Sequence, residues 1–382
     1  MEQASQPRSE GAASFHVGQG FFNPGARPSR DLGVLLVRTI RRQRPPRVLD
    51  LMAGCGLRSL RYGLEGQVRC LWANDADPHR LPLLRTNLGV LAERCLLRQT
   101  TQTAHRLLAD CLLRGEHFDL VDLDAFGSPH ALVPLALEAV ALEGCLYLAS
   151  TDGRGPTGHD RRAAVRRLGA SGRSHPASWE QALRLQIGVL ARCAWSQGRG
   201  LEPVVSFSDG RTFRTAVRLR RHPRADEEAA LGLLAICHGC GDQQVQSLLN
   251  LRGWRACACS PAGRSALAVS GPLWTGPLQH LPTLEAMAVE AAAVPMTLSR
   301  EGGALLERLR GDRGWPARSW PHALLARQLG SPPPPLRAVV ARLRQEGFLA
   351  VSSGVMPGQL RSDAPWPTIL ALAADLVKGP VK

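Results

Sequence analysis

The chain is almost free of lysine and has no long apolar run. Only Lys378 and Lys382 are lysines among its 47 basic residues. No uninterrupted apolar stretch reaches the ~18–20 residues that span a bilayer, and the first residues show no basic-then-apolar signal pattern. We therefore expect no membrane attachment and a cytoplasmic location. An apolar content of 44% over 382 residues excludes a wholly disordered chain and favours two domains.

The positive charge is carried by arginine and is unevenly distributed. Residues 1–153 have a net charge of +1, whereas residues 154–221 hold 14 arginines and four acids. Residues 300–350 hold nine arginines and four acids. Arginine presents a planar fork that suits phosphate, so the two excesses favour a polyanionic partner such as nucleic acid. A solvated basic face and an arginine-rich codon bias are the alternative interpretations.

The pattern of apolar segments predicts an α/β fold. Short apolar strands alternate with helical periodicity up to residue 221, which is typical of a doubly wound, Rossmann-like sheet. The expected strands are 47–51, 68–73, 118–124, 144–150 and a closing pair within 201–219; the expected helices are 31–40, 57–64, 78–91, 132–142 and 179–196. Composition predicts a disordered tail over 1–14, a first domain over 15–221, and a smaller α+β domain over 222–382 after His222-Pro223.

The C-terminal part of the second domain has the element order of a winged helix. Helical patterns over 321–329 and 336–346 are followed by a short apolar strand over 348–351. Arg337, Arg342 and Arg344 share the second helix, which commonly faces nucleic acid in such domains. A helical hairpin with solvated arginines explains the same pattern, and both interpretations remain open.

A glycine turn between the first strand and its helix predicts a nucleotide-type cofactor site. Gly54 and Gly56 let the backbone approach a ligand, and the third glycine of a dinucleotide fingerprint is missing. Asp75 ends the next strand, where a carboxylate can accept both ribose hydroxyls. With Asp50 ahead of the turn, the pattern suits S-adenosylmethionine or NAD. For each acid alone, a turn or capping role is the alternative.

The segment from Asp122 to Pro129 favours methylation of a base. Asp124 ends a strand, and Phe126 follows it by two residues. A carboxylate can hydrogen-bond the amino hydrogens of guanine and orient the lone pair toward a methyl donor, while the ring stacks on a flipped base. The alternative is a capping aspartate beside a buried phenylalanine.

Several motifs together resemble the tRNA (guanine-26-N2)-dimethyltransferase family over most of the chain. The matching stretches are Phe22–Pro24, Ser29–Leu32, Gly56–Tyr62, Ala73–Asp75, Asp122–Pro129, Thr151-Asp152, Glu180–Arg184, Gly271–Pro277 and Ser362–Pro365. The resemblance implies S-adenosylmethionine-dependent methylation of the guanine 2-amino group at position 26, or a neighbour, of tRNA. An inactive tRNA-binding or chaperone protein on the same fold is the alternative. No protein partner can be inferred.

The resemblance also assigns residues. It implies that S-adenosylmethionine is held by Arg30, Arg58, Asp75 and Asp110, with Cys111 in place of the usual alanine. Asp124 matches the catalytic acid and Phe126 the stacking residue. Ala125 replaces the family's proline, which is expected to loosen the turn.

The ten cysteines are expected to be reduced thiols or metal ligands. The family often has a four-cysteine zinc site, and here Cys237 and Cys240 keep the first Cys-x-x-Cys pair. Ala262 stands where the fourth cysteine belongs, so Cys257 is expected to join Cys259 in the second pair. Buried thiols without metal are the alternative.

Overall fold

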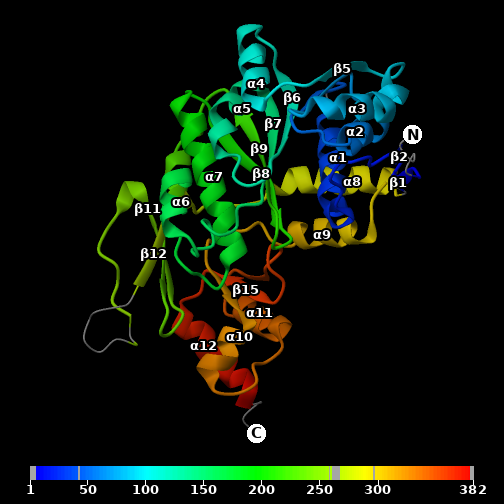
Figure 1. Ribbon diagram of the computed structural model, residues 1–382. Helices are drawn as coiled ribbons and strands as arrows, with labels where there is room; N and C mark the ends of the chain where they lie inside the picture. Colours follow the sequence, from blue (N-terminus) through cyan, green and yellow to red (C-terminus); the bar gives the residue numbers. More distant parts are fainter. Residues whose placement is uncertain (1–5, 42–43, 258, 260–266, 296, 379–382) are drawn as a thin grey trace.

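The protein, seen in a computed structural model that describes residues 6–41, 44–257, 259, 267–295 and 297–378, is built on a seven-stranded sheet (Figure 1). The strands lie in the order β5-β4-β3-β6-β7-β9-β8. They are β3 (Arg47–Asp50), β4 (Cys70–Asn74), β5 (Leu96–Thr100), β6 (Phe118–Asp124), β7 (Val140–Ser150), β8 (Gly200–Ser208) and β9 (Phe213–Arg220). The first five in this order are parallel, and β9 and β8 close the sheet antiparallel.

Helices cover both faces of this sheet, as the Rossmann-like prediction requires. One buried apolar cluster joins the sheet to α1 (Arg27–Arg41), α2 (Leu57–Gly66) and α3 (Leu81–Leu88). A second joins the other face to α4 (Ala104–Leu113), α5 (Val133–Ala139) and α7 (Ser178–Ser196). The short α6 (Arg161–Leu168) packs beside α7. The α/β fold class is therefore confirmed.

Most predicted elements form close to the expected residues. The helix predicted for 132–142 is shorter, because β7 already begins at Val140. The strand β5 and the helix α4 were not predicted. Short 3₁₀ helices join the larger elements: η1 (Pro24–Ala26), η2 (Pro78–Arg80), η3 (Gly89–Leu91), η4 (His130–Leu132), η5 (Glu227–Ala230) and η6 (Leu248–Asn250).

The N-terminal segment is ordered, so the predicted tail over 1–14 is wrong for residues 6–14; residues 1–5 lie outside the described residues. The strands β1 (Arg8–Glu10) and β2 (Ala13–Phe15) form an antiparallel hairpin. Glu10 is buried and accepts hydrogen bonds from Arg30 (2.7 Å) and Arg61 (2.9 Å). A buried carboxylate needs such partners, and they fasten the hairpin to α1 and α2.

After β9 the chain forms a separate antiparallel sheet, and it then adds two helices to the first domain. The strands β10 (Leu231–Cys237), β11 (Gln243–Ser247) and β12 (Leu267–Trp274) form an antiparallel sheet with β10 in the middle. The helices α8 (Leu281–Ala293) and α9 (Arg300–Arg310) pack against α1 and share its apolar cluster. The predicted boundary at 221 thus coincides with the end of the large sheet, but residues 281–310 fold onto the first domain.

The last part forms a compact unit at the lower end of the molecule in Figure 1. It consists of β13 (Ser319–Pro321), α10 (His322–Leu329), α11 (Leu336–Gln345), β14 (Ala350–Ser352), β15 (Gln359–Ser362) and α12 (Trp366–Lys378). Trp320 and Trp366 stack at its core with ring centroids 5.2 Å apart. The elements follow the predicted order, and their identity as a winged helix stays a prediction. Among the described residues no helix is both long and apolar enough to cross a bilayer.

Candidate active site

A cavity of about 630 Å³ opens at the carboxyl ends of β3, β4 and β6. Parallel strands of a doubly wound sheet direct ligands to this edge. Predicted site residues that line the cavity are Arg30, Asp50, Gly54, Arg58, Asp75, Asp124 and Phe126. The sequence-based hypothesis of a single site at the strand ends is therefore supported by the way these residues meet.

The glycine turn after β3 is held by the aspartate after β4. The Gly54 amide donates to Asp75 Oδ2 at 2.9 Å, and the Asp77 amide donates to Oδ1 at 3.0 Å. Gly54 has φ +58° and Gly56 φ +82°, conformations that side chains rarely adopt. A Cβ on Gly56 would also approach Leu84 to 3.0 Å. Gly56 therefore shapes the turn from beneath without lining the cavity.

Asp50 lies at the floor of the cavity and is almost completely buried. It accepts a hydrogen bond from the Ser59 hydroxyl at 2.7 Å. Burial, and after it the charge of Asp122, raises the pKa of Asp50 to about 7. Asp50 thus ties β3 to α2 and is a weaker source of negative charge than Asp124.

Two arginines hold the carboxylate at the end of β6. Arg58 Nη2 donates to Asp124 Oδ2 at 2.8 Å, and Arg214 Nη2 lies 2.7 Å from the same oxygen. Both arginines also pair with Asp122, which is fully buried: Arg214 Nη1 at 2.9 Å and Arg58 Nε at 3.3 Å. The result is a network of two cations and two carboxylates in which Asp124 is the acid that reaches the cavity.

The network keeps Asp124 ionised. Burial alone would raise its pKa, but the guanidinium groups of Arg214 and Arg58 outweigh that effect and lower the pKa to about 2. The Asp124 side chain retains 33% of its exposure. Asp124 is therefore a charged acceptor of hydrogen bonds that a ligand can reach.

The loop after Asp124 presents the Phe126 ring to solvent, next to the ring of Phe21 from the segment before η1. Phe126 is 79% exposed, and its ring meets the exposed Phe21 edge to face with centroids 5.5 Å apart. Gly127 anchors the loop, because its amide donates to Thr151 Oγ1 at 2.6 Å and its carbonyl accepts from the Thr151 amide at 3.0 Å. These bonds fix the turn, so the proline that Ala125 replaces is not needed to hold it.

Arg30 reaches the cavity from α1. Its guanidinium pairs with Glu10, and both terminal nitrogens donate to the Asn23 carbonyl at 3.2 Å. It also lies over the Phe22 ring, 5.4 Å from the centroid. The N-terminal hairpin and η1 thus position one wall of the cavity.

Two predicted cofactor residues do not reach the cavity. Asp110 and Cys111 lie in the second half of α4, and Cys111 is completely buried in the apolar cluster on that face. The cavity is lined instead by Ala104, the first residue of α4. The assignment of Asp110 and Cys111 to cofactor binding is corrected accordingly, because α4 meets the cavity at Ala104, nearly two helical turns before Asp110.

Some cavity residues were missed by the sequence-based reasoning. Arg214 comes from β9 and Phe21 from the segment before η1. Arg214 could have been found from the sequence, because it alternates with apolar residues in a strand that is expected to be buried. A buried arginine requires an acidic partner. Phe21 carried no signal beyond its proximity to the Phe22–Pro24 motif.

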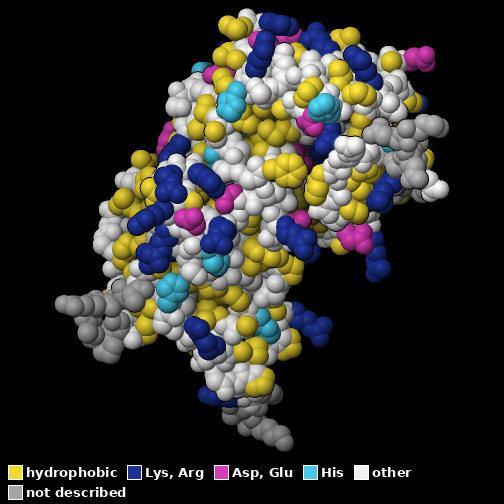
Figure 2. Space-filling view, in the orientation of Figure 1, with side chains coloured by type: hydrophobic (Ala, Val, Ile, Leu, Met, Phe, Trp, Pro, Cys, Tyr) yellow, Lys and Arg dark blue, Asp and Glu magenta, His cyan; other side chains and the backbone are white. Residues whose placement is uncertain are grey.

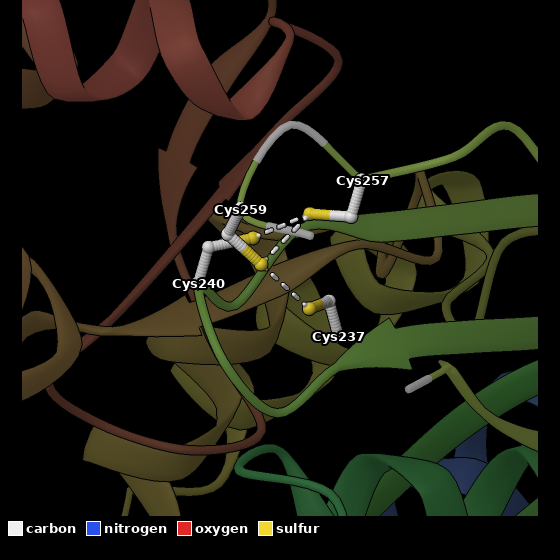
Figure 3. A group of neighbouring side chains, drawn as sticks. All are labelled: Cys237, Cys240, Cys257 and Cys259. Carbon is white, nitrogen blue, oxygen red and sulfur yellow. Dashed lines mark hydrogen bonds between the residues drawn. The ribbon is translucent and has the colours of Figure 1, made fainter. Parts of the chain in front are cut away.

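A second cluster brings together Cys237, Cys240, Cys257 and Cys259. Their sulfur atoms all lie within 4.8 Å of one another, and Figure 3 shows them converging from β10, its following turn and the segment before β12. The sulfur atoms of Cys240 and Cys257 are 2.9 Å apart, and those of Cys237 and Cys259 are 3.4 Å apart. The predicted substitution by Cys257 is thus geometrically supported; Ala262 lies outside the described residues.

A basic surface lies over α6, where Figure 2 shows arginines gathered on one face. Arg161, Arg162 and Arg166 are exposed, and within the described part of the chain they form no ion pair. Arg167 pairs with Asp152 at 2.6 Å, and the Asp152 amide donates to the Gly127 carbonyl at 3.3 Å. The basic helix is therefore attached to the loop that carries Phe126.

Comparison with known proteins identifies the family of the chain. Residues 5–373 match the family described as N2,N2-dimethylguanosine tRNA methyltransferase. The tRNA (guanine(26)-N(2))-dimethyltransferase of Methanosphaerula palustris is 30% identical over 92% of this chain and 90% of its own length. The enzyme of that name from Pyrococcus abyssi is 26% identical over 93% of each chain.

A solved structure gives the same fold. Trm1 from Pyrococcus horikoshii in complex with S-adenosyl-L-methionine superposes with a TM-score of 0.83 at 22% identity, over 96% of this chain and 99% of that one. With the strand-end cavity and the Asp124–Phe126 loop, the match over nearly the whole length means that this chain belongs to the N2,N2-dimethylguanosine tRNA methyltransferase family.

Proposed function

We propose that the protein methylates the exocyclic 2-amino group of a guanine in tRNA, at position 26, with S-adenosylmethionine as methyl donor. One observation carries the proposal beyond family membership: Asp124 is held ionised between Arg58 and Arg214 at the cavity, two residues before the exposed Phe126. A charged acceptor next to an exposed ring is the pair of groups that an amino-bearing base requires.

The cavity fits S-adenosylmethionine. Arg58 Nη1 is buried and has no hydrogen-bond partner within the described chain, so it is available to the carboxylate of the donor. Asp75 is fixed by two backbone amides, and its remaining lone pairs can accept from ribose hydroxyls. Bound S-adenosylmethionine supplies a methyl group carried on a positively charged sulfur.

Asp124 then orients the base. Its carboxylate accepts the amino hydrogens of guanine, which turns the nitrogen lone pair toward the donor and holds it there. Because two arginines keep its pKa at about 2, Asp124 stays charged through the neutral range and passes the released proton to solvent instead of retaining it. Phe126 stacks on the guanine once that base has flipped out of the tRNA helix.

The basic helix α6 binds the tRNA backbone close to the reacting base. Its arginines are exposed, and the Arg167–Asp152–Gly127 contacts connect it to the loop of Phe126. Phosphate contacts of this kind set the register of a nucleic acid without reading its sequence. A cytoplasmic location accords with a tRNA substrate and with ten cysteines, none of which forms a disulfide within the described chain.

The four-cysteine cluster holds a structural zinc ion. Cys237, Cys240, Cys257 and Cys259 would hold the ion, because four thiolates confined within 4.8 Å of one another are a ligand set that structural Zn²⁺ takes. Trp366 Nε1 donates to the Cys240 carbonyl at 2.7 Å, and Trp320 Nε1 donates to the Gly241 carbonyl at 2.9 Å. The cysteine-bearing turn therefore fixes the tryptophan core of the C-terminal unit against the second sheet.

An unmodified tRNA transcript and labelled S-adenosylmethionine test the proposal. We expect label in N2-methylated guanosine after digestion, and none when guanine 26 is replaced by adenine. An inactive tRNA-binding protein instead binds the transcript without incorporation. That alternative rests on Ala125 and on the imperfect cysteine set. The hydrogen bonds between Gly127 and Thr151 hold the turn without a proline, and Cys257 supplies a fourth sulfur to the cluster.

A further inference from the structure

A second cavity, of about 560 Å³, lies in the C-terminal half of the molecule. It is a groove formed by α9, α11 and the connection between β14 and β15. None of its lining residues lines the catalytic cavity. The groove is therefore a separate site, and nothing in the proposed chemistry uses it.

The groove is lined by arginine without compensating acid. Arg308 comes from α9, and Arg337 and Arg344 come from α11. All three are exposed, and in the described ranges no carboxylate lines the groove or pairs with them. The neighbouring Arg342, which the sequence grouped with Arg337 and Arg344, is paired with Glu346 at 2.9 Å and does not line it. Three converging guanidiniums create a concave positive surface suited to phosphate groups.

The walls of this groove are fastened together. Asp312, just after α9, is buried; its Oδ2 accepts from the Gly354 amide at 2.9 Å, and its Oδ1 accepts from Arg361 Nε at 2.8 Å. Arg344 Nε donates to the Ala350 carbonyl at 2.7 Å, which fixes its guanidinium at the start of β14. The backbone walls of the groove and the Arg344 side chain are thus held in place before binding, which reduces the ordering that binding requires.

We propose that this groove binds a stretch of tRNA sugar–phosphate backbone away from the reacting guanine. The inference rests on the proposed function for the identity of the RNA. Arg308, Arg337 and Arg344 neutralise phosphates, and the Ser352 hydroxyl donates to a phosphate or ribose oxygen. These contacts carry no sequence information; they anchor the tRNA body while the base is methylated at the strand ends.

Two double variants matched in charge and position test the groove. Arg308→Ala with Arg337→Ala removes one groove arginine from each helix. Arg300→Ala with Arg342→Ala removes one arginine from each of the same helices outside the groove. Affinity for unmodified tRNA is measured over a series of salt concentrations, with melting temperatures as a check on folding. Methyl transfer at saturating tRNA is measured in parallel.

For the groove variant we expect affinity to fall roughly tenfold and the salt slope to drop by about one for each phosphate that is no longer neutralised. Its rate at saturating tRNA stays that of the wild type, and the control variant changes less than about twofold in affinity. Hydroxyl-radical footprinting adds a readout: one protected backbone segment disappears in the groove variant and is kept in the control. Equal affinities, slopes and footprints for the two variants would overturn the proposal.

Failure of the groove and failure of the function remain distinguishable. Binding and footprinting do not require methyl transfer, so they test the groove even with an inactive wild type. Conversely, a wild type that methylates guanine 26 while the groove variant binds normally leaves the function intact and refutes the groove. If the groove double variant has a lowered melting temperature, single charge reversals replace the double variants. Arg337→Glu, at an exposed position in the groove, is then the test variant, and Arg342→Glu, outside the groove, is its control.

Discussion

Arg214 Nη2 lies 2.7 Å from Asp124 Oδ2, so an arginine of the antiparallel strand β9 fixes the carboxylate at the end of the parallel strand β6. β7 separates the two strands in the sheet. The fully buried Arg214 also lies over the Tyr147 ring of β7, 4.4 Å from its centroid. Its position is therefore determined by packing, and with it the position and charge of Asp124.

Replacing Arg214 by glutamine shifts the acid limb of the pH–rate profile to higher pH. Asp124 is depressed in pKa by Arg214 and Arg58, so the removal of one cation moves its protonation upward. We also expect kcat to fall about 10–100-fold, since the carboxylate is then positioned by one arginine only. The profile of kcat/KM is measured through the acid range for Arg214→Gln and for Arg218→Gln, which replaces an arginine of the same strand paired with Glu202 at 3.0 Å. An unmoved acid limb in Arg214→Gln contradicts the assignment.

Removal of the Phe126 ring weakens tRNA binding more than it slows chemistry. Base–aromatic stacking is worth about 1–3 kcal/mol, so Phe126→Ala raises KM for tRNA by about 5–150-fold. Phe126→Trp retains a stacking surface and stays close to wild type. Steady-state kinetics with both variants give the comparison, and an unchanged KM in Phe126→Ala shows that the exposed ring does not contact the base.

Asp75 and Asp110 respond differently to neutralisation. Asp75→Ala lowers affinity for S-adenosylmethionine by about 10–100-fold, since it removes an acceptor for the donor and releases the Gly54 amide. Asp110→Asn leaves the affinity unchanged because Asp110 does not line the cavity. Calorimetric titration with the donor measures both. Equal decreases in the two variants restore Asp110 to the binding site and contradict the geometry.

The N-terminal hairpin depends on a buried ion network for its attachment. Arg61 is fully buried and pairs with Glu10 at 2.9 Å, Asp31 at 2.6 Å and Glu65 at 2.9 Å. Arg61→Met removes the buried cation that these three carboxylates share and lowers the free energy of unfolding by about 3–5 kcal/mol. Arg310→Met, at a more exposed pair, costs less than about 1 kcal/mol. Urea denaturation of both variants is the measurement, and equal stabilities refute the network's role.

Zinc content and stability fall together when the cysteine cluster is disrupted. We expect about one zinc per chain by elemental analysis. Cys240→Ser, or a strong chelator, removes the metal and lowers the melting temperature. Cys193→Ser, a thiol outside the cluster, keeps both. Wild-type protein that contains no zinc as purified, or whose melting temperature a chelator leaves unchanged, contradicts the zinc proposal.

The local parts of the site were predictable, and the tertiary parts were not. Asp75 and Asp124 end strands, and Gly54 precedes a helix, so short-range patterns indicate where they meet. Arg214 reaches the cavity only because β9 enters the sheet antiparallel beside β7, which no local pattern specifies.

The errors have physical causes of the same kind. Polar composition predicted a disordered tail, but Glu10 becomes ordered through Arg30 and Arg61, which are remote in sequence. Asp110 was assigned by resemblance to a motif, whereas only the first turn of α4 faces the cavity. The groove required Arg308 of α9 to approach α11, and the chain brings these two helices together only on folding.

The most direct test of the account is single-turnover methyl transfer by Asp124→Asn, with affinities for tRNA and S-adenosylmethionine measured on the same preparation. The amide keeps the shape of the side chain and removes its charge. We predict a rate of guanine N2 methylation about 10³-fold below that of the wild type, with both affinities within about threefold. A rate within tenfold of the wild type would contradict the central claim that the ionised Asp124 carboxylate orients the reacting amine.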